Sequence, residues 1–343
     1  MTMRGNIPIP ELPSDVETWL IVAVTNVRAG TTKQGAPFLT AVARNASGSI
    51  PLRVWSDVLD PAQPLTPGLW GIEGRREAYE RNDQFIVTRY KPVTIDRYRE
   101  HQHNEPPLPR AFTIDIETVA IPEYRERVPD VLERNARLGK MRIEQIERYA
   151  EDADAEADRV YALGSLSATS GRIVSIAVHV APLPEFAVEG HASSEHAFGI
   201  DEEGRDQGEV VALEQFFVLL ENFDRDVDEI VGHNVLDFDL PFIYQRALVN
   251  ELRVPRLVNL AEYSVRGVYD TQRAWWLGQR KSVSLDDIAW ALGLTSSKTK
   301  DIEGSTVYEL FHSGRLADIR EYNLKDIRLT RKIYERLVNC FGR

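Results

Sequence analysis

Residues 112–118 read FTIDIET, and apolar side chains alternate with polar ones along this stretch. A period of two predicts a β-strand with one apolar face. Asp115 and Glu117 then point from the same face, with about 7 Å between their α-carbons. Two acids this close repel each other unless a cation lies between them, and a hard divalent ion with oxygen ligands is the usual partner. Taken alone, the stretch also fits an ordinary edge strand whose polar face is solvated.

The composition is that of a globular protein too long for one hydrophobic core. The chain has 343 residues, 43% of them hydrophobic, which favours two domains. No apolar run is long enough to span a bilayer, and the N-terminus lacks the apolar segment of a signal peptide. The single cysteine, Cys340, excludes a disulfide framework. Together these features predict a cytoplasmic protein.

The charge is unevenly distributed along the chain. The net charge is −12, but the first 110 residues hold 13 basic and 12 acidic side chains, so the acidic excess lies entirely downstream. A negative net charge argues against a protein that coats nucleic acid by bulk attraction. A carboxylate metal site would use only about four acids, so acidity alone does not identify one.

Residues 15–98 read as short strands separated by turn signals, which indicates a small barrel. The five strands are expected at residues 19–29, 38–44, 50–55, 69–79 and 84–93. Basic and aromatic side chains are interleaved in this region, a mixture that suits single-stranded nucleic acid, where bases stack on rings and cations follow phosphates. The same aromatic residues also suit a barrel interior. The candidate contacts are Arg44, Arg53, Trp55 and Tyr79.

The region around FTIDIET divides into four further segments. Residues 99–110 are polar with three prolines and predict a semi-rigid linker. Residues 121–163 carry opposite charges at helical spacing and predict an insertion of one or two solvated helices, which can also form a wall or lid over a substrate. Residues 172–180 predict a strand paired with FTIDIET in a hairpin, and residues 209–222 predict an amphipathic helix.

A second polar cluster follows a short buried strand expected at residues 229–232. Residues 233–239 read HNVLDFD, and a helix begins directly afterwards, with Pro241 in its first turn. Asp239 can cap this helix, or it can supply a third carboxylate to a metal site.

The third cluster lies in a helix expected at residues 316–337. Tyr322 and Asp326 are four residues apart, so both point from one face of this helix. Many helix surfaces carry such a pair, and its meaning therefore depends on the other two clusters.

The three clusters appear in the order D-x-E, N-x-x-x-F-D and Y-x-x-x-D. This ordered set resembles the DnaQ-like 3′–5′ exonucleases, which have an RNase H-like fold, and is most similar to the exonuclease domains of family-B DNA polymerases. Glu321 stands where the histidine form of the family has its histidine, which indicates the tyrosine (DEDDy) class. The first hundred residues resemble the OB-fold domains that precede nuclease domains in some bacterial enzymes. The resulting expectation is an all-β OB-fold barrel in residues 1–98, a linker in 99–110, and an α/β exonuclease domain with a mixed sheet in 111–343.

The resemblance implies a metal site and a substrate site. Two Mg²⁺ or Mn²⁺ ions would be held by Asp115, Glu117, Asp239 and Asp326, and the Tyr322 hydroxyl would orient the attacking water. Asn234 and Phe238 match positions that contact the terminal nucleotide, although Asn234 equally well braces its turn. Lys298 and Lys300 can bind phosphates, or they can be solvated loop lysines, and Asp270 is expected to be structural.

The predicted function is a metal-dependent exonuclease that removes nucleoside 5′-monophosphates from the 3′ end of single-stranded DNA while the barrel holds the strand. An RNA exonuclease shares the chemistry, because the choice depends on whether a 2′-OH is accommodated. The same motifs also fit a proofreading subunit for a polymerase or repair partner, and a non-catalytic nucleic-acid-binding module.

Overall fold

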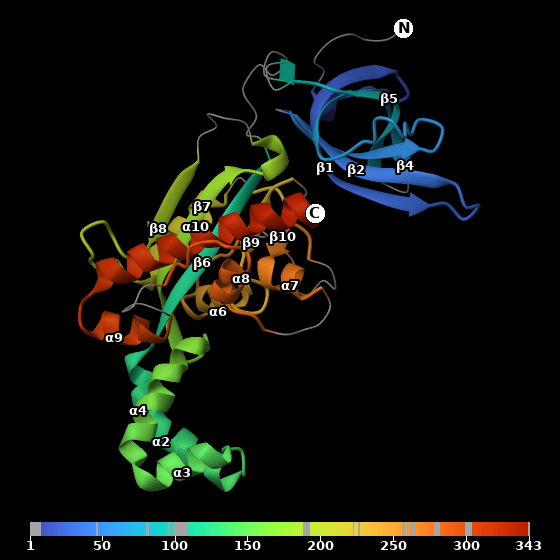
Figure 1. The fold of residues 1–343 in the computed structure, drawn as a ribbon. Coiled ribbons are helices and arrows are strands. Elements are labelled where there is room, and N and C mark those ends of the chain that lie inside the picture. Colours follow the sequence, from blue (N-terminus) through green and yellow to red (C-terminus); the bar gives the residue numbers. More distant parts are fainter. Residues whose placement is uncertain are drawn as a thin grey trace.

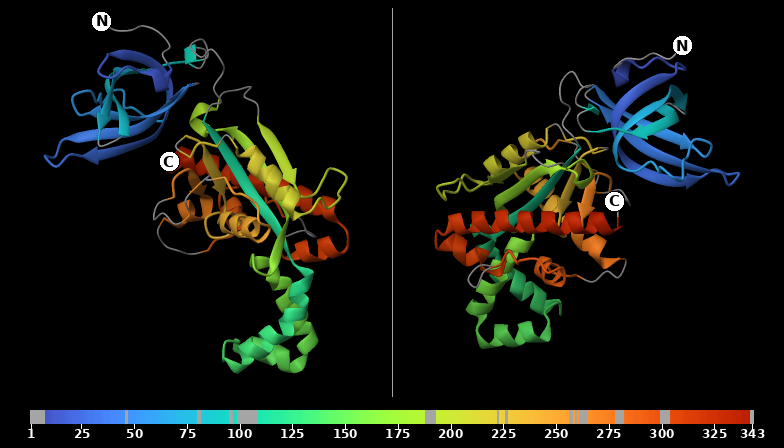
Figure 2. Two further views of the ribbon diagram at one scale, coloured as in Figure 1. Left: turned by 180° about the vertical axis from the view of Figure 1, so that it is seen from behind. Right: turned by 45° about the horizontal axis from the view of Figure 1, so that its top comes forward.

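The structure is a computed structural model in which residues 8–45, 47–79, 82–94, 97–98, 109–187, 193–221, 223–225, 227–255, 258, 260, 265–277, 282–298 and 304–341 are described. A closed barrel lies at one end of the molecule, an α/β sheet in the middle and a helical arm at the other end (Figure 1). The views from behind and from above in Figure 2 show the same order.

The barrel contains five strands in the order β1-β2-β3-β5-β4, preceded by the short turn η1 (Ile9–Glu11). Alternate side chains point inward, and the interior is filled by apolar residues such as Leu20, Ile72 and Phe85. Each strand lies where the alternation and turn signals predict it, so the prediction of a small barrel is confirmed. The strands are β1 (Thr18–Thr31), β2 (Pro37–Asn45), β3 (Gly48–Trp55), β4 (Gly68–Tyr79) and β5 (Asn82–Pro92).

The α/β part is built on a mixed five-stranded sheet in the order β10-β9-β6-β7-β8. The FTIDIET stretch forms its central strand, so the interpretation of this stretch as an edge strand is wrong. β7 pairs antiparallel with β6 in the expected hairpin, and β9 pairs with β6 in parallel. The strands are β6 (Arg110–Ala120), β7 (Gly171–Pro182), β8 (Ser194–Phe198), β9 (Glu229–Gly232) and β10 (Val268–Asp270).

Helices cover both faces of this sheet. Phe112, Ile114 and Ile116 of β6 pack with α5 (Glu209–Leu219) and α6 (Asp239–Val249) on one face. Because side chains alternate along a strand, Asp115 and Glu117 point to the opposite face, which is covered by α10. Helices α7 and α8 also pack on α10. The elements on this side are α7 (Thr271–Trp276), α8 (Leu285–Ala291), η4 (Gly304–Thr306), α9 (Val307–His312) and α10 (Leu316–Phe341).

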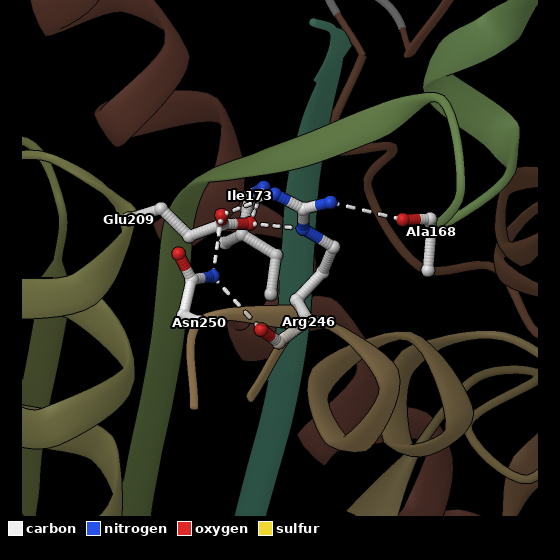
Figure 3. A network of polar contacts seen from close by, with 5 residues as sticks. All are labelled: Ala168, Ile173, Glu209, Arg246 and Asn250. Atoms are coloured by element: carbon white, nitrogen blue, oxygen red, sulfur yellow. Dashed lines mark hydrogen bonds and ion pairs between the residues drawn. The ribbon is translucent and has the colours of Figure 1, made fainter. Parts of the chain in front are cut away.

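Helix α5 differs from the expected amphipathic helix. It ends at Leu219 rather than at residue 222, and it exposes Val210, Val211 and Val218 in addition to its buried apolar face. Its first residue, Glu209, accepts hydrogen bonds from the Arg246 guanidinium of α6, with N···O distances of 2.9 and 2.7 Å, and from the Ile173 amide of β7 (Figure 3). The Asn250 side chain and the Ala168 carbonyl complete this network, which ties α5 and α6 to the sheet.

The predicted charged insertion is an arm of three helices rather than one or two, namely α2 (Pro122–Arg137), α3 (Ile143–Glu151) and α4 (Ala153–Leu163). Gly139, with φ at +62°, ends the first helix, and the Asp152 side chain caps the third. The arm has a small core of its own that includes Leu132, Met141 and Tyr161. The short turns η2 (Gly164–Leu166) and η3 (Pro184–Phe186) flank β7.

The barrel and the sheet share a buried contact. Ile21 and Ala23, on the outer side of β1, lie in one apolar cluster with Val231 and Tyr334 of the α/β part. Residues 99–108 of the expected linker lie outside the described residues, and Arg110 already belongs to β6. Among the described helices, none is both long enough and apolar enough to cross a membrane.

Candidate metal centre

Three carboxylates converge between the central strand and the last helix. Asp115 and Glu117 of β6 and Asp326 of α10 each offer a ligand oxygen, and these oxygens lie within 4.8 Å of one another. Glu117 and Asp326 are only 8% and 7% exposed, so little water is available to solvate their charges.

Asp239 joins this group from a different direction. It is the first residue of α6, and its side chain does not cap the helix, so the capping interpretation is wrong. Its Oδ1 instead accepts a hydrogen bond from the amide of Ile116, the residue between the two acids of β6, at 3.1 Å. The fourth carboxylate is therefore joined directly to the strand that carries the first two.

The turn before α6 is held by Asp270 at the end of β10. Its carboxylate accepts from the backbone amides of Asn234 and Leu236, both at 3.1 Å, and it also caps α7. Asn234 has φ at +63°, and its carbonyl accepts from the amides of Asp237 and Phe238. The turn that delivers Asp239 is thus fixed by backbone contacts, and Asn234 and Asp270 both brace it.

Burial and neighbouring negative charges raise the pKa values of all four carboxylates. Burial, and then the charges of Asp239, Asp326 and Glu117, raise the pKa of Asp115 well above its ordinary value. Burial and the charges of Asp326 and Asp239 do the same for Glu117. Mainly through burial, the pKa of Asp239 is raised to about 7 and that of Asp326 to about 6. The ionised cluster is therefore unfavourable without a cation.

Neighbouring polar groups orient these acids. Asn323 Nδ2 donates to Asp115 Oδ2 at 2.6 Å, and its own oxygen accepts from the Ser175 hydroxyl at 2.8 Å. The Tyr322 and Ser297 side chains lower the pKa of Asp326, which partly offsets the effect of burial. Three of these residues, Asn323, Ser175 and Ser297, are absent from the sequence-based predictions, because none is a specified position of a motif and their partners lie on distant segments.

The cluster fits a divalent cation. Asp326 Oδ1 is buried and has no hydrogen-bond partner among the described residues, which leaves this oxygen available as a metal ligand. All four groups are carboxylates, and oxygen ligands are those that Mg²⁺ and Mn²⁺ prefer.

Phe238 and Lys298 are the remaining predicted residues of the α/β part that the structure describes. Phe238 is half-buried against Phe242, with ring centroids 5.5 Å apart. Asp237 forms an ion pair with Arg273 at 2.7 Å and does not join the carboxylates. Lys298 pairs with Asp286 at 2.9 Å, and its charge lowers the pKa of Asp326. Lys300 lies outside the described residues.

The predicted barrel residues lie in different places. The Arg53 guanidinium lies 4.7 Å from the ring centroid of Phe38 and 5.3 Å from that of Trp55, which is 37% exposed. Arg44 faces the α/β part, 3.9 Å from the buried Asp228, so it contributes to the contact between the two parts. Tyr79 ends β4, and its side chain lies outside what the structure describes.

Comparisons with known proteins identify the family of the chain. Residues 166–343 match the family described as "Predicted 3'-5' exonuclease related to the exonuclease domain of PolB". This match spans more than half of the chain, so the protein belongs to that family of exonucleases. No curated protein matches the chain.

Three solved structures are similar in shape at low identity. A family B DNA polymerase from the archaeon Pyrobaculum calidifontis is 17% identical, with a TM-score of 0.48; the match covers 93% of this chain and 46% of the polymerase. A replication protein A heterotrimer bound to ssDNA is 15% identical over 25% of this chain and 64% of that one, with a TM-score of 0.21. The second OB-fold domain of replication protein A from Methanococcus maripaludis is 14% identical over 27% of this chain and 95% of that one, also with a TM-score of 0.21. These values do not identify the family of the barrel.

Proposed function

We propose that this protein is a metal-dependent 3′–5′ exonuclease of the DEDDy class that degrades single-stranded DNA, and that its barrel is an OB-fold that holds the strand. The observation that carries this proposal is the convergence of four carboxylates with raised pKa values at one place, together with an unpaired Asp326 oxygen. We also propose that the OB-fold domain comprises residues 1–98 and the exonuclease domain residues 111–343.

The carboxylates Asp115, Glu117, Asp239 and Asp326 would hold the metal. Two bound Mg²⁺ or Mn²⁺ ions would supply positive charge for the attacking and leaving oxygens of a phosphodiester. The protein contributes a rigid frame for these ligands, because Asn323 holds Asp115 and the Ile116 amide holds Asp239.

Tyr322 would orient the attacking water through its hydroxyl. Burial and the charges of Asp326, Glu117 and Asp115 raise the pKa of this phenol above its ordinary value, so it keeps its proton at neutral pH. A protonated phenol donates hydrogen bonds and is no general base. The terminal nucleotide would lie against Asn234 and Phe238, and Lys298 would neutralise a phosphate nearby.

The barrel would bind the strand through Arg53, Phe38 and Trp55. Their rings and guanidinium gather on the outer side of β2 and β3, where bases can stack and a phosphate can pair with the cation. Arg44 has the weakest support as a contact with the strand, because its guanidinium faces the Asp228 carboxylate of the α/β part.

A digestion experiment tests the proposal. Single-stranded DNA, duplex DNA and RNA, each labelled at the 5′ end, are incubated with Mg²⁺, Mn²⁺ or EDTA. We expect a ladder that shortens from the 3′ end of single-stranded DNA only when metal is present. Endonucleolytic fragments, or digestion that EDTA does not stop, would exclude the proposal, and faster digestion of RNA would assign the enzyme to RNA.

The matched variant is Asp115→Asn, which keeps the size of the side chain but removes a charge from the cluster. We expect it to bind the strand and to lose digestion, whereas Asp237→Asn, an acid outside the cluster, should digest at the wild-type rate. Equal digestion by Asp115→Asn and wild type would show that the cluster is not the site.

A further inference from the structure

A polar hollow lies where the barrel meets the α/β part. Its volume is about 350 Å³, and residues from β1, β2 and β3 line it together with one residue of the loop before β10. The polar side chains among them are Asn26, Arg28, Thr40, Ser49 and Arg266.

The hollow is lined by positively charged side chains, whereas the protein as a whole is negatively charged. Two arginines line it, and none of the described residues that line it is acidic, although the net charge of the chain is −12. Arg28 and Arg266 are exposed, and within the described part of the chain neither forms an ion pair. A guanidinium offers several donors in a fixed planar fork, and this geometry matches the oxygens of a phosphate.

The hollow adjoins the aromatic group of the barrel. Thr40, which lines it, is the strand partner of both Arg28 on β1 and Arg53 on β3. Arg53 in turn lies over Phe38 and Trp55, so one continuous outer surface runs from the exposed rings into the hollow.

Arg266 connects the hollow to the elements that carry the metal centre. Arg266 precedes β10, and the far end of that strand, Asp270, holds the turn that delivers Asp239. The distance from Arg266 to Asp270 along the chain is roughly 13 Å at the rise of a β-strand. Arg266 and the turn that supplies Asp239 are therefore connected by one short strand.

We propose that Arg28 and Arg266 form a phosphate-binding site that holds a single nucleic-acid strand as it passes from the barrel to the metal centre. This proposal rests on the proposed function and adds a defined contact to it. Each arginine pairs with a phosphate of the strand, and a strand too short to extend from the metal centre to the hollow does not use the site.

The test is an Arg28→Ala/Arg266→Ala variant of the full chain. Its affinity for a labelled single strand of about twenty nucleotides is measured by fluorescence anisotropy in EDTA over a series of salt concentrations. We expect a loss of about five- to tenfold, and a salt slope that is shallower by about 1.4 because two phosphate contacts are missing. Digestion of a trinucleotide with Mg²⁺ should proceed at the wild-type rate.

The matched control is Lys332→Ala/Arg336→Ala, which removes two exposed cations of α10 and changes the net charge equally. The proposal is wrong if both double variants change the salt slope alike, or if the arginine variant binds the long strand as the wild type does. Because binding is measured without metal, a wild type that binds but digests nothing would refute the proposed activity and not the phosphate site. Thermal melting of each variant confirms that it is folded.

Discussion

Asn323 connects the last helix to the central strand through a single side chain. It donates to Asp115 and accepts from Ser175; Asn323 and Ser175 are fully buried between α10 and the sheet, and Asp115 is half-buried. Asparagine in this position fixes the orientation of the carboxylate before any cation binds.

We therefore expect Asn323→Ala to weaken Mn²⁺ binding by about 10- to 100-fold, the usual cost of removing a residue that orients a metal ligand. Isothermal titration of the variant and of wild type with Mn²⁺ measures this loss. Arg336→Ala, an exposed change on the same helix, serves as the control and should bind Mn²⁺ normally. Unchanged Mn²⁺ affinity in Asn323→Ala would show that Asp115 needs no such support.

The raised pKa values of the acids predict how the stability of the metal-free protein depends on pH. The pKa of Asp326 is raised from 3.8 to about 6 and that of Asp239 from 3.8 to about 7, so the folded state binds these protons more tightly than the unfolded state. Their contribution to stability is complete below pH 3.8 and is lost as the pH rises to about 7.

In EDTA, the melting temperature of wild type relative to that of Asp326→Asn should therefore fall between about pH 4 and pH 7. Added Mg²⁺ should raise the wild-type melting temperature more at high pH than at low pH, because the ion competes with protons for the same oxygens. Differential scanning fluorimetry across this pH range measures both effects. If the difference in melting temperature between the two proteins does not vary with pH, the pKa of Asp326 is not raised in the folded state.

At the scale of residues, the sequence predicts the groups that carry charge but not the groups that orient them. Asp115, Glu117, Asp239 and Asp326 stand in short motifs with a fixed order. Asn323 lies 208 positions from the carboxylate that it holds, and no spacing rule connects the two. Partners of this kind follow from the packing of α10 on β6, which local patterns do not encode.

At the scale of elements, the ion pair between Glu209 and Arg246 joins two helices that no turn connects. Both side chains are 8% exposed or less, and the Glu209 carboxylate also accepts from the Ile173 amide and from Asn250. Arg246 lies on the helix that begins with Asp239, so this network also supports the metal centre.

Replacing only Arg246, as in Arg246→Met, should lower the free energy of unfolding by about 3–5 kcal/mol, because the Glu209 charge is left buried without its cation. The double variant Glu209→Leu/Arg246→Met should recover most of that loss, since it removes both charges. Urea unfolding of the two variants and of wild type measures the difference. Equal stability of the single and double variants would show that the buried charge is not the cause.

The sequence also predicts most helices and strands, but it does not predict where a helical segment breaks into separate helices. The two periods, 2 along FTIDIET and 3.6 along residues 316–337, identify β6 and α10 because both have one strongly apolar side. Opposite charges at helical spacing continue through residues 121–163 and predict only one or two helices for the arm. Its breaks at Gly139 and Asp152 depend on a left-handed residue and a cap, and a charged surface hides such local signals.

At the scale of the molecule, the barrel packs against the α/β part through a buried apolar contact. Leu20 and Val22 of β1 fill the barrel, whereas Ile21 and Ala23, which alternate with them, pack with Val231 and Tyr334. A strand covered on both sides reads as a continuous apolar run, and residues 19–24, WLIVAV, have that character. The sequence therefore contained a signal for this contact, although it did not reveal which surface covers the strand.

Truncation of the barrel would leave Val231 and the ring of Tyr334 exposed, so loss of function in a truncated chain would not show what the barrel does. A point change in the shared cluster is more informative. Inter-domain contacts that are apolar and buried couple unfolding, whereas polar ones allow independent motion. We therefore expect wild type to unfold in one calorimetric transition.

Ala23→Asp should separate this transition into two. Ala23 is completely buried, and an aspartate there carries a charge into an apolar contact without a partner, which costs several kcal/mol. The free-energy cost is lowest if the barrel and the α/β part separate, because water can then solvate the charge. Each of the two parts would then unfold in a transition of its own. Ala29→Asp lies on the exposed part of the same strand and should keep one transition. One unshifted transition in Ala23→Asp would mean that the two bodies do not stabilise each other.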